Sequence, residues 1–108
     1  PTDSEAWFSL GVLHTMASRL DEACYAYEQA ATQQPSHAKA WNNLALLQHA
    51  RRKLPEAELA YRHSLIANLD YRDALYNFAL LLQQQERILE ATVLYEKLLR
   101  LHPDFAEA

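Results

Sequence analysis

Glycine and cysteine are almost absent from this sequence, which has one of each among its 108 residues. A glycine-rich loop that cradles phosphate groups needs several glycines, and Gly11 stands alone, so sites of that kind are excluded. The single cysteine, Cys24, can form neither an intramolecular disulfide nor a thiolate metal cage. It leaves the redox compartment open, because a lone cysteine occurs in oxidising and reducing compartments alike.

Long apolar runs and an excess of positive charge are also missing. No stretch approaches the roughly 20 apolar residues that a membrane span requires, and no signal-peptide pattern opens the sequence. The net charge of -4 argues against nucleic-acid binding, which normally shows as a basic stripe. The one basic run, at residues 51–53, is typical of a solvated turn. We therefore expect a soluble protein, in the cytoplasm, with neither a membrane span nor a nucleic-acid partner.

The sequence contains no recognisable catalytic or metal-binding arrangement. Its five histidines form no pair at a spacing of four, and none is flanked by acidic residues at ligand spacing. Cys24 lies among apolar residues and is interpreted as a small packing residue. We predict no catalytic residue, no metal and no cofactor, and a protein that is not itself an enzyme.

The dominant positive feature is an internal repeat with a 34-residue period. Trp7 and Trp41 are separated by this interval, and three copies fit the chain at residues 4–37, 38–71 and 72–105. Residues 106–108 are predicted to begin a further, truncated helix, and the absence of an initiator Met suggests a fragment of a longer protein. Five positions carry one residue type in all three copies: Ala6, Ala40 and Ala74; Leu13, Leu47 and Leu81; Glu22, Glu56 and Glu90; Ala23, Ala57 and Ala91; and Tyr27, Tyr61 and Tyr95.

Each copy is predicted to form two helices joined by a short turn. In the first copy the two apolar faces, at helical spacing, are Trp7, Leu10, Gly11 and His14, then Leu20, Ala23, Cys24 and Tyr27. The turns within copies are placed at residues 17–19, 51–53 and 85–87, and the breaks between copies at 35–36, 68–70 and 103–104. Ser36, Asp70 and Asp104 are predicted to cap the helices that follow them, and Thr2 with Glu5 forms a capping box.

Stacking explains why small residues recur in the pattern. A two-helix hairpin cannot cover its apolar face alone, so neighbouring hairpins must stack. Gly11 lies inside a predicted helix, where glycine costs roughly 1 kcal/mol relative to alanine. We therefore predict a close approach between helices at Gly11.

The first copy resembles the tetratricopeptide repeat, whose signature combines a Trp, a Leu-Gly pair, an Ala and aromatic pair, and a Pro in each repeat. The matching residues are Trp7, Leu10, Gly11, Ala23, Tyr27 and Pro35. The departures are His14, Gln48 and Leu82 where an aromatic is usual, Leu69 in place of a proline, and no glycine in the turns within repeats. The resemblance implies an all-α, right-handed solenoid of six helices that acts as a protein-interaction scaffold, with the first helices lining a concave groove.

Arrays of this family usually end in a polar capping helix, which is missing here. We expect the outer face of the third copy, including Leu94, Leu98 and Leu101, to be partly uncovered. Exposed apolar faces are often interaction surfaces. Either further repeats follow in the parent protein, or the chain self-associates end to end.

The helix face opposite the core should line the groove. Its predicted peptide-binding residues are Phe8, Ser9 and Val12 in the first copy, Lys39, Asn42, Asn43, Leu46 and His49 in the second, and Asp73, Tyr76, Asn77 and Leu80 in the third. Asparagine is a poor helix former, so the pair Asn42 and Asn43 calls for a reason other than helix stability. Asn43 and Asn77 occupy equivalent positions of successive copies, and we expect their amides to stack one repeat apart, with Ser9 in the same row.

A row of amides can hold an extended peptide, because a side-chain amide offers the donors and acceptor that complement a peptide backbone. Peptide-binding members of the family, including the repeat region of the O-linked N-acetylglucosamine transferase, carry asparagines similar in kind. The carboxylate clamp of chaperone-binding members is not supported, because Phe8, Val12, Asp73 and Asn77 occupy its positions and only Asn43 fits. Alanine at Asn43 or Asn77 is therefore expected to leave stability unchanged or slightly raised while weakening peptide binding.

Three functions remain open at this point. The first is a scaffold that binds an extended peptide segment of a partner protein. The second is a structural spacer that self-associates through its uncapped end. The third is the substrate-recognition arm of a larger enzyme such as a protein glycosyltransferase. Polar residues on a solvated helix face are the plain alternative to a peptide groove.

Overall fold

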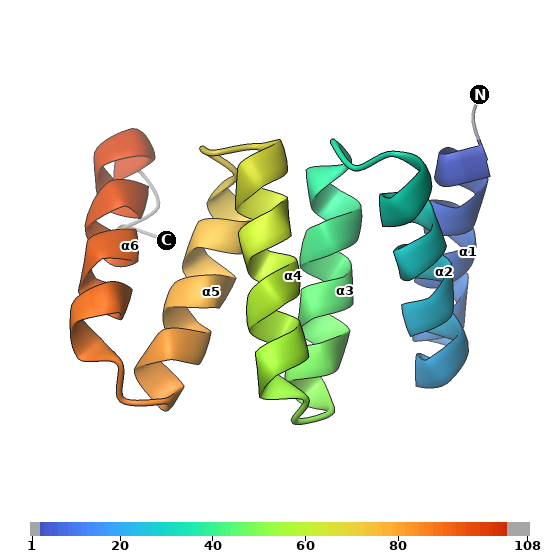
Figure 1. Ribbon diagram of the computed structural model, residues 1–108, viewed down its shortest axis with the longest axis horizontal. Coiled ribbons are helices and arrows are strands. Elements are labelled where there is room, and N and C mark those ends of the chain that lie inside the picture. The colour runs from blue at the N-terminus through green and yellow to red at the C-terminus, as the bar shows by residue number, and fades with distance from the viewer. Residues whose placement is uncertain (1–2, 104–108) are drawn as a thin grey trace.

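A computed structural model describes residues 3–103 of the chain, and within this range all regular structure is helical. The six helices form three antiparallel hairpins that follow one another along the longest axis (Figure 1). Their bounds are α1 Asp3–Met16, α2 Leu20–Gln33, α3 Ala38–Ala50, α4 Leu54–Ala67, α5 Arg72–Gln84 and α6 Ile88–Leu101. The predicted all-α solenoid is confirmed.

The turns within hairpins are where predicted and share one backbone shape. Three residues separate the two helices of each hairpin, and the middle residue has a positive φ: 61° at Ser18, 64° at Arg52 and 60° at Glu86. This left-handed conformation normally favours glycine, because a Cβ then crowds the following carbonyl oxygen. None of the three turns has a glycine, so each hairpin tolerates a strained residue at the same place.

Neighbouring hairpins are joined by the second helix of one hairpin packing on the first helix of the next. Thus α2 contacts α3, and α4 contacts α5. The main buried cluster runs through these contacts, from Tyr27 on α2 through Leu44 on α3 and Tyr61 on α4 to Phe78 on α5. The rings of Tyr61 and Phe78 stack with centroids 5.7 Å apart.

The predicted close approach at Gly11 is present in the first hairpin. Gly11 is buried against the ring of Tyr27, and a Cβ added to it would lie 2.6 Å from Tyr27 Cε1 and 2.7 Å from Cδ1. These distances are too short for a real Cβ contact. Gly11 therefore costs helix stability but allows α1 and α2 to pack closely.

In each of the first two hairpins, a serine hydroxyl on one helix donates a hydrogen bond to a backbone carbonyl on the other helix. In the first, Ser4 Oγ on α1 donates to the Ala30 carbonyl on α2 at 2.9 Å. In the second, Ser64 Oγ on α4 donates to the Ala38 carbonyl on α3 at 2.8 Å. At the 34-residue interval, Ser4 is equivalent to Ala38 and Ser64 is equivalent to Ala30. The same hydrogen bond therefore forms in both hairpins, but the serine is on the first helix of one hairpin and on the second helix of the other. Both hydroxyls are buried.

Arginines in the turns after α3 and α5 reach back to the preceding hairpin. Arg51 donates to Cys24 Sγ at 3.5 Å and pairs with Asp21. Arg87 donates to Glu58 Oε1 at 2.6 Å and to Oε2 at 3.1 Å. The hydrogen bonds from Arg87 lower the pKa of the Glu58 carboxyl, with a smaller contribution from Arg62. Each of these ion pairs therefore connects two successive hairpins, from the turn of one hairpin to the second helix of the hairpin before it.

The predicted helix caps at Ser36 and Asp70 are wrong. His37 rather than Ser36 precedes α3, and its Nδ1 accepts a hydrogen bond from the Ala40 amide at 3.2 Å. Tyr71 rather than Asp70 precedes α5, and its side chain makes no cap bond. The Asn68 side chain instead accepts from the Asp70 amide, which stabilises the turn before α5. Thr2, Asp104 and the further helix at residues 106–108 lie outside the described residues.

The burial of the two end helices also differs from expectation. Leu10, predicted to lie in the core, is 39 % exposed, because no described helix packs on the outer side of α1. Leu98, predicted to be uncovered, is 1 % exposed, because it faces the interior of its own hairpin at the position of Ala30 and Ser64. Leu94 is half-buried and Leu101 exposed. The outer face of α6 is therefore built from other residues than those predicted.

Replacement of Arg52 by glycine is expected to stabilise the fold by about 0.5 to 1 kcal/mol, because it relieves a left-handed L-residue whose cost exceeds the loss of chain entropy. Urea denaturation measures the change. Arg52→Ala is the control, since it removes the same exposed side chain and keeps the strain. An equal gain from both variants would show that the side chain, not the backbone, is responsible.

Replacement of Gly11 by alanine is expected to destabilise the fold by about 1 to 2 kcal/mol, because overpacking against Tyr27 outweighs the better helix propensity. The cost should vanish when the ring is removed. We therefore expect Gly11→Ala to be neutral or stabilising in a Tyr27→Leu background, as measured by a double-mutant cycle. A stability gain in the parent background would show that the ring moves aside freely.

Glu58→Gln is expected to lower stability at neutral pH but not in acid. A carboxyl with a lowered folded pKa stabilises the fold above its unfolded pKa, and this contribution is lost as the pH falls through the folded pKa. The difference in urea midpoint between parent and Glu58→Gln should therefore narrow as the pH falls below about 4.5. Glu96→Gln, at an exposed position of α6, is the control for replacing one carboxylate by an amide.

Candidate functional site

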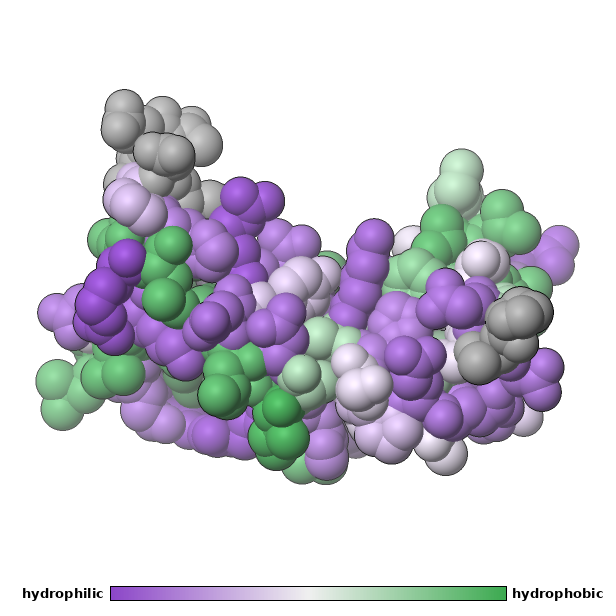
Figure 2. Space-filling model, turned by 90° about the horizontal axis from the view of Figure 1, so that it is seen from above, coloured by the Kyte–Doolittle hydropathy of each residue, from purple (hydrophilic) through white to green (hydrophobic). Residues whose placement is uncertain are grey.

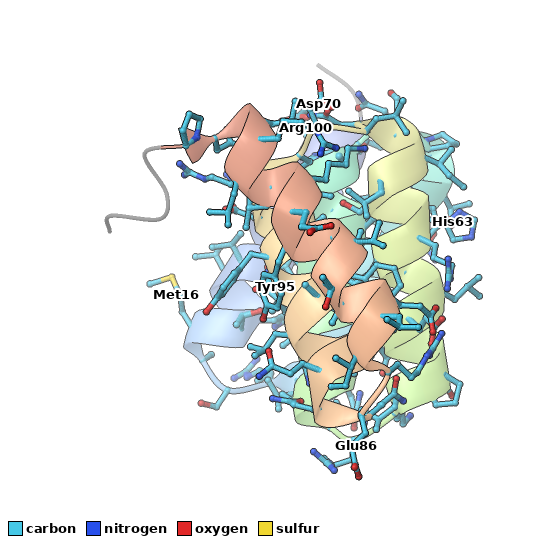
Figure 3. All side chains as sticks on the ribbon, turned by 90° about the vertical axis from the view of Figure 1, so that its left-hand side faces the viewer. Met16, His63, Asp70, Glu86, Tyr95 and Arg100 are labelled. Atoms are coloured by element: carbon cyan, nitrogen blue, oxygen red, sulfur yellow. The ribbon has the colours of Figure 1, made fainter. Side chains whose placement is uncertain are left out.

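The two long sides of the molecule differ in shape and in the helices that form them. Viewed along the helices, one side is hollowed between the end formed by α1 and the end formed by α6 (Figure 2). Met16 of α1 and Tyr95 of α6 lie on this side, and His63 of α4 lies on the opposite side (Figure 3). We call the first side the concave face and the second the convex face.

The asparagines of the concave face do not form the predicted row. Asn77 Nδ2 donates to Asn42 Oδ1 at 3.3 Å, and Asn43 Nδ2 donates to Tyr27 Oη at 3.5 Å. Asn42 is 2 % exposed, so its assignment to the peptide-binding surface is wrong. Asn42 instead joins α3 to α5. Asn43 and Asn77 remain half-buried, and each bond uses one N–H, which leaves a carbonyl oxygen and a second N–H on each amide.

Aliphatic side chains repeat along the concave face at the 34-residue interval. Val12 on α1 and Leu80 on α5 are half-buried, and Leu46 on α3 is 40 % exposed. Beside this row, Phe8 packs on Tyr27 with ring centroids 5.6 Å apart, and Tyr76, 38 % exposed, packs on Tyr95. Phe8 and Tyr76 thus each pack on the tyrosine of the second helix of their own hairpin.

Histidine and tyrosine form a polar link that the sequence reasoning missed. His49 Nε2 donates to Gln84 Oε1 at 2.7 Å, which leaves Nδ1 to accept from Tyr61 Oη at 3.4 Å. The same tyrosine position recurs in the other hairpins, where Tyr27 meets Asn43 and Tyr95 donates to Gln83. The repeat pattern alone indicates only a packing role for these tyrosines. The tyrosine hydroxyls could have indicated the polar contacts, because the hydroxyl of a buried tyrosine usually has a hydrogen-bond partner.

Charged side chains of both signs lie near the start of α3, at one end of the molecule. Lys39 Nζ lies over the Phe8 ring, 5.6 Å from its centroid, and links α1 to α3. Glu5 lies 3.7 Å from His37 Nε2, and these residues with Lys39 and Tyr71 line a depression of about 450 Å³. Ser9 and Asp73 are exposed. Both signs of charge are present, so this end does not select a strongly acidic or basic ligand.

The convex face carries two depressions that are equivalent by the repeat. The first is lined by residues including Glu28, Leu44 and Leu59, and the second by Arg62, Phe78 and Val93, each 34 positions later. Trp41 and His63 stack in the first with centroids 4.4 Å apart. The second is bounded by Arg62 over the Phe78 ring. Ring stacking and ion pairs occupy these surfaces.

The described residues contain neither a metal-binding cluster nor a membrane-spanning helix. Residues 3–103 contain no group of three or more His, Cys, Asp or Glu side chains that could hold a metal ion. None of the six helices has the length and apolar character needed to cross a bilayer.

Solved structures with this fold are similar over most of the chain but low in sequence identity. The first TPR of Spaghetti (RPAP3) bound to an HSP90 peptide is 21% identical, with a TM-score of 0.87, over 94% of this chain and 80% of that one. MamA is 21% identical, with a TM-score of 0.88, over 97% of this chain and 61% of that one. The Arabidopsis OM64 TPR domain is 18% identical, with a TM-score of 0.86, over 94% and 84%. These likenesses establish the fold alone.

Sequence comparison assigns the family. A comparison with curated proteins finds no match. Three stretches match family models that are each described as a tetratricopeptide repeat, at residues 1–33, 26–59 and 73–105. Together these matches extend over most of the sequence, and the chain belongs to the tetratricopeptide repeat family.

Proposed function

We propose that the chain is a scaffold that binds an extended peptide segment of a partner protein along its concave face. The observation that carries the proposal is the combination of one aliphatic row and two part-exposed side-chain amides. The aliphatic row of Val12, Leu46 and Leu80 runs beside the half-buried amides of Asn43 and Asn77. A family of interaction modules and a hollowed face agree with this function.

The amides and the aliphatic row suit different parts of an extended chain. The amides of Asn43 and Asn77 keep an acceptor and a donor each, so they can pair with peptide N–H and C=O groups whatever the peptide sequence. The aliphatic row offers contacts to apolar side chains, with Leu46 the most exposed of the three. Burial of apolar area favours binding, although the loss of translational, rotational and side-chain freedom offsets part of this gain. Sequence preference would therefore come from the aliphatic row.

The mixed charge of the concave face favours an internal peptide segment over a free carboxyl terminus. Asp73 is exposed at one position where a carboxylate clamp needs a cation, and Val12 occupies another that needs an amide. The HSP90 peptide is a ligand of the RPAP3 domain, and the residues of this chain give no reason to expect the same ligand. A peptide with apolar residues and little net charge fits the face better.

Asn43→Ala should separate binding from stability. We expect stability to change by less than about 1 kcal/mol, because better helix propensity offsets the loss of the 3.5 Å bond to Tyr27 Oη. Affinity should fall by about 1 kcal/mol or roughly five-fold. A peptide array screened with the chain supplies the ligand, and fluorescence anisotropy measures the affinity. Gln33→Ala, at an exposed position of α2, is the control and should change no affinity.

Asn77→Ala should behave differently from the expectation drawn from the sequence alone. It removes the donor to Asn42, whose buried oxygen is then unpaired, so we expect a loss of about 1 to 3 kcal/mol of stability as well as weaker binding.

Peptides that bind the parent and Asn43→Ala equally, but lose affinity for Leu59→Lys on the convex face, would refute the proposed groove.

A further inference from the structure

The outer side of α1 is an apolar face without a neighbour among the described residues. Ala6 is exposed, Leu10 is 39 % exposed and Leu13 is 61 % exposed. Ala6 and Leu10, together with Asp3 and Trp7, line a depression of about 350 Å³. This end of the molecule lies apart from the concave face.

The same positions in the next two hairpins show what covers such a face. Ala40 and Ala74 are 0 % exposed, and Leu47 and Leu81 are 8 % and 0 % exposed. Their cover is the second helix of the preceding hairpin. On α3, for example, Ala40 and the half-buried Trp41 pack against Ala30 and Ala31 of α2. The occupant that fits α1 is therefore a helix with the residue pattern of α2 and α4.

Within the described chain, α6 is the helix of this type whose equivalent face is not covered. The face consists of Ile88, Thr92, Tyr95 and Leu99, which repeat Leu54, Glu58, Tyr61 and Leu65 of α4. Leu99 is 44 % exposed, whereas Leu65 is half-buried and Ala31 is 0 % exposed. Figure 3 looks onto this end, with α6 in front and Tyr95 at its edge.

We propose that α6 of one copy of this chain packs on the Ala6, Leu10 and Leu13 face of α1 in a second copy, continuing the packing of α2 on α3 and of α4 on α5. The register follows from the repeat: Leu99 would cover Ala6, as Ala31 covers Ala40. The polar residues at the border are also compatible. Glu96 would lie opposite His14, at the positions of Glu28 and Gln48, which line one depression within the chain.

This contact joins different faces of the two copies, so it does not close on itself. Such a heterologous contact adds copies one after another, and the assembly grows with concentration. The concave face of each copy would stay accessible and continue into that of the next. The proposal goes beyond peptide binding and uses a separate surface, so either can fail without the other.

Sedimentation velocity of the 108-residue chain, from about 10 µM to about 1 mM, tests the proposal in a range suited to weak association. We expect the weight-average mass to rise at least two-fold above the 12.4 kDa of one copy. Leu13→Lys blocks the α1 face and Leu99→Lys blocks the α6 face, and each variant alone should stay monomeric. Leu89→Lys is the matched control, because Leu89 is 83 % exposed on α6 outside the proposed face.

Mixing the two blocked variants gives the decisive result. One retains the α6 face and the other the α1 face, so an equimolar mixture should form dimers that grow no further. Circular dichroism verifies that both variants are folded. A parent chain that stays monomeric throughout the range, association of either variant alone, or a mixture that remains monomeric would each overturn the proposal.

Discussion

The structure depends on one recurring contact, in which the second helix of a hairpin covers the first helix of the next. A single hairpin exposes more apolar surface than it can bury, so each repeat is stable only with a neighbour. The cover of α2 on α3 and of α4 on α5 buries the same positions twice, at Ala40 and Ala74 and at Leu47 and Leu81. Where the cover is missing, on α1, the same residue types are exposed.

This contact also sets the shape of the candidate site. Because the second helices occupy one side, α1, α3 and α5 place their remaining side chains on the other. The links across it are specific: Asn77 to Asn42 and His49 to Gln84 join α3 to α5, and Lys39 over Phe8 joins α1 to α3. The concave face is therefore a bonded surface in which some polar groups are already used.

The fold was predictable from the sequence because the repeat period identifies both the hairpins and their stacking. The recurrence of Val12, Leu46 and Leu80 at equivalent positions of α1, α3 and α5 was also predictable from the 34-residue period. The hydrogen-bond partner of each side chain was not predictable, because it depends on small differences in distance between side chains of different hairpins. Asn42 and Asn43 are neighbours of one type, yet one is buried against Asn77 and the other reaches Tyr27. The cap of α3 was not predicted for a related reason: the ring nitrogen of His37, and not the Ser36 hydroxyl, accepts the hydrogen bond from the Ala40 amide.

The exchanged serines of the first two hairpins bear on how such chains diverge. Aligned by their period, both columns would count as variable, since each pairs a serine with an alanine in these hairpins. What persists is the bridge between a hydroxyl and a carbonyl, supplied from whichever helix of the hairpin holds the serine. An alignment that scores each position separately does not detect this kind of compensation. Such compensation is one physical route by which helical arrays can keep a backbone geometry while retaining about a fifth of their residues in common.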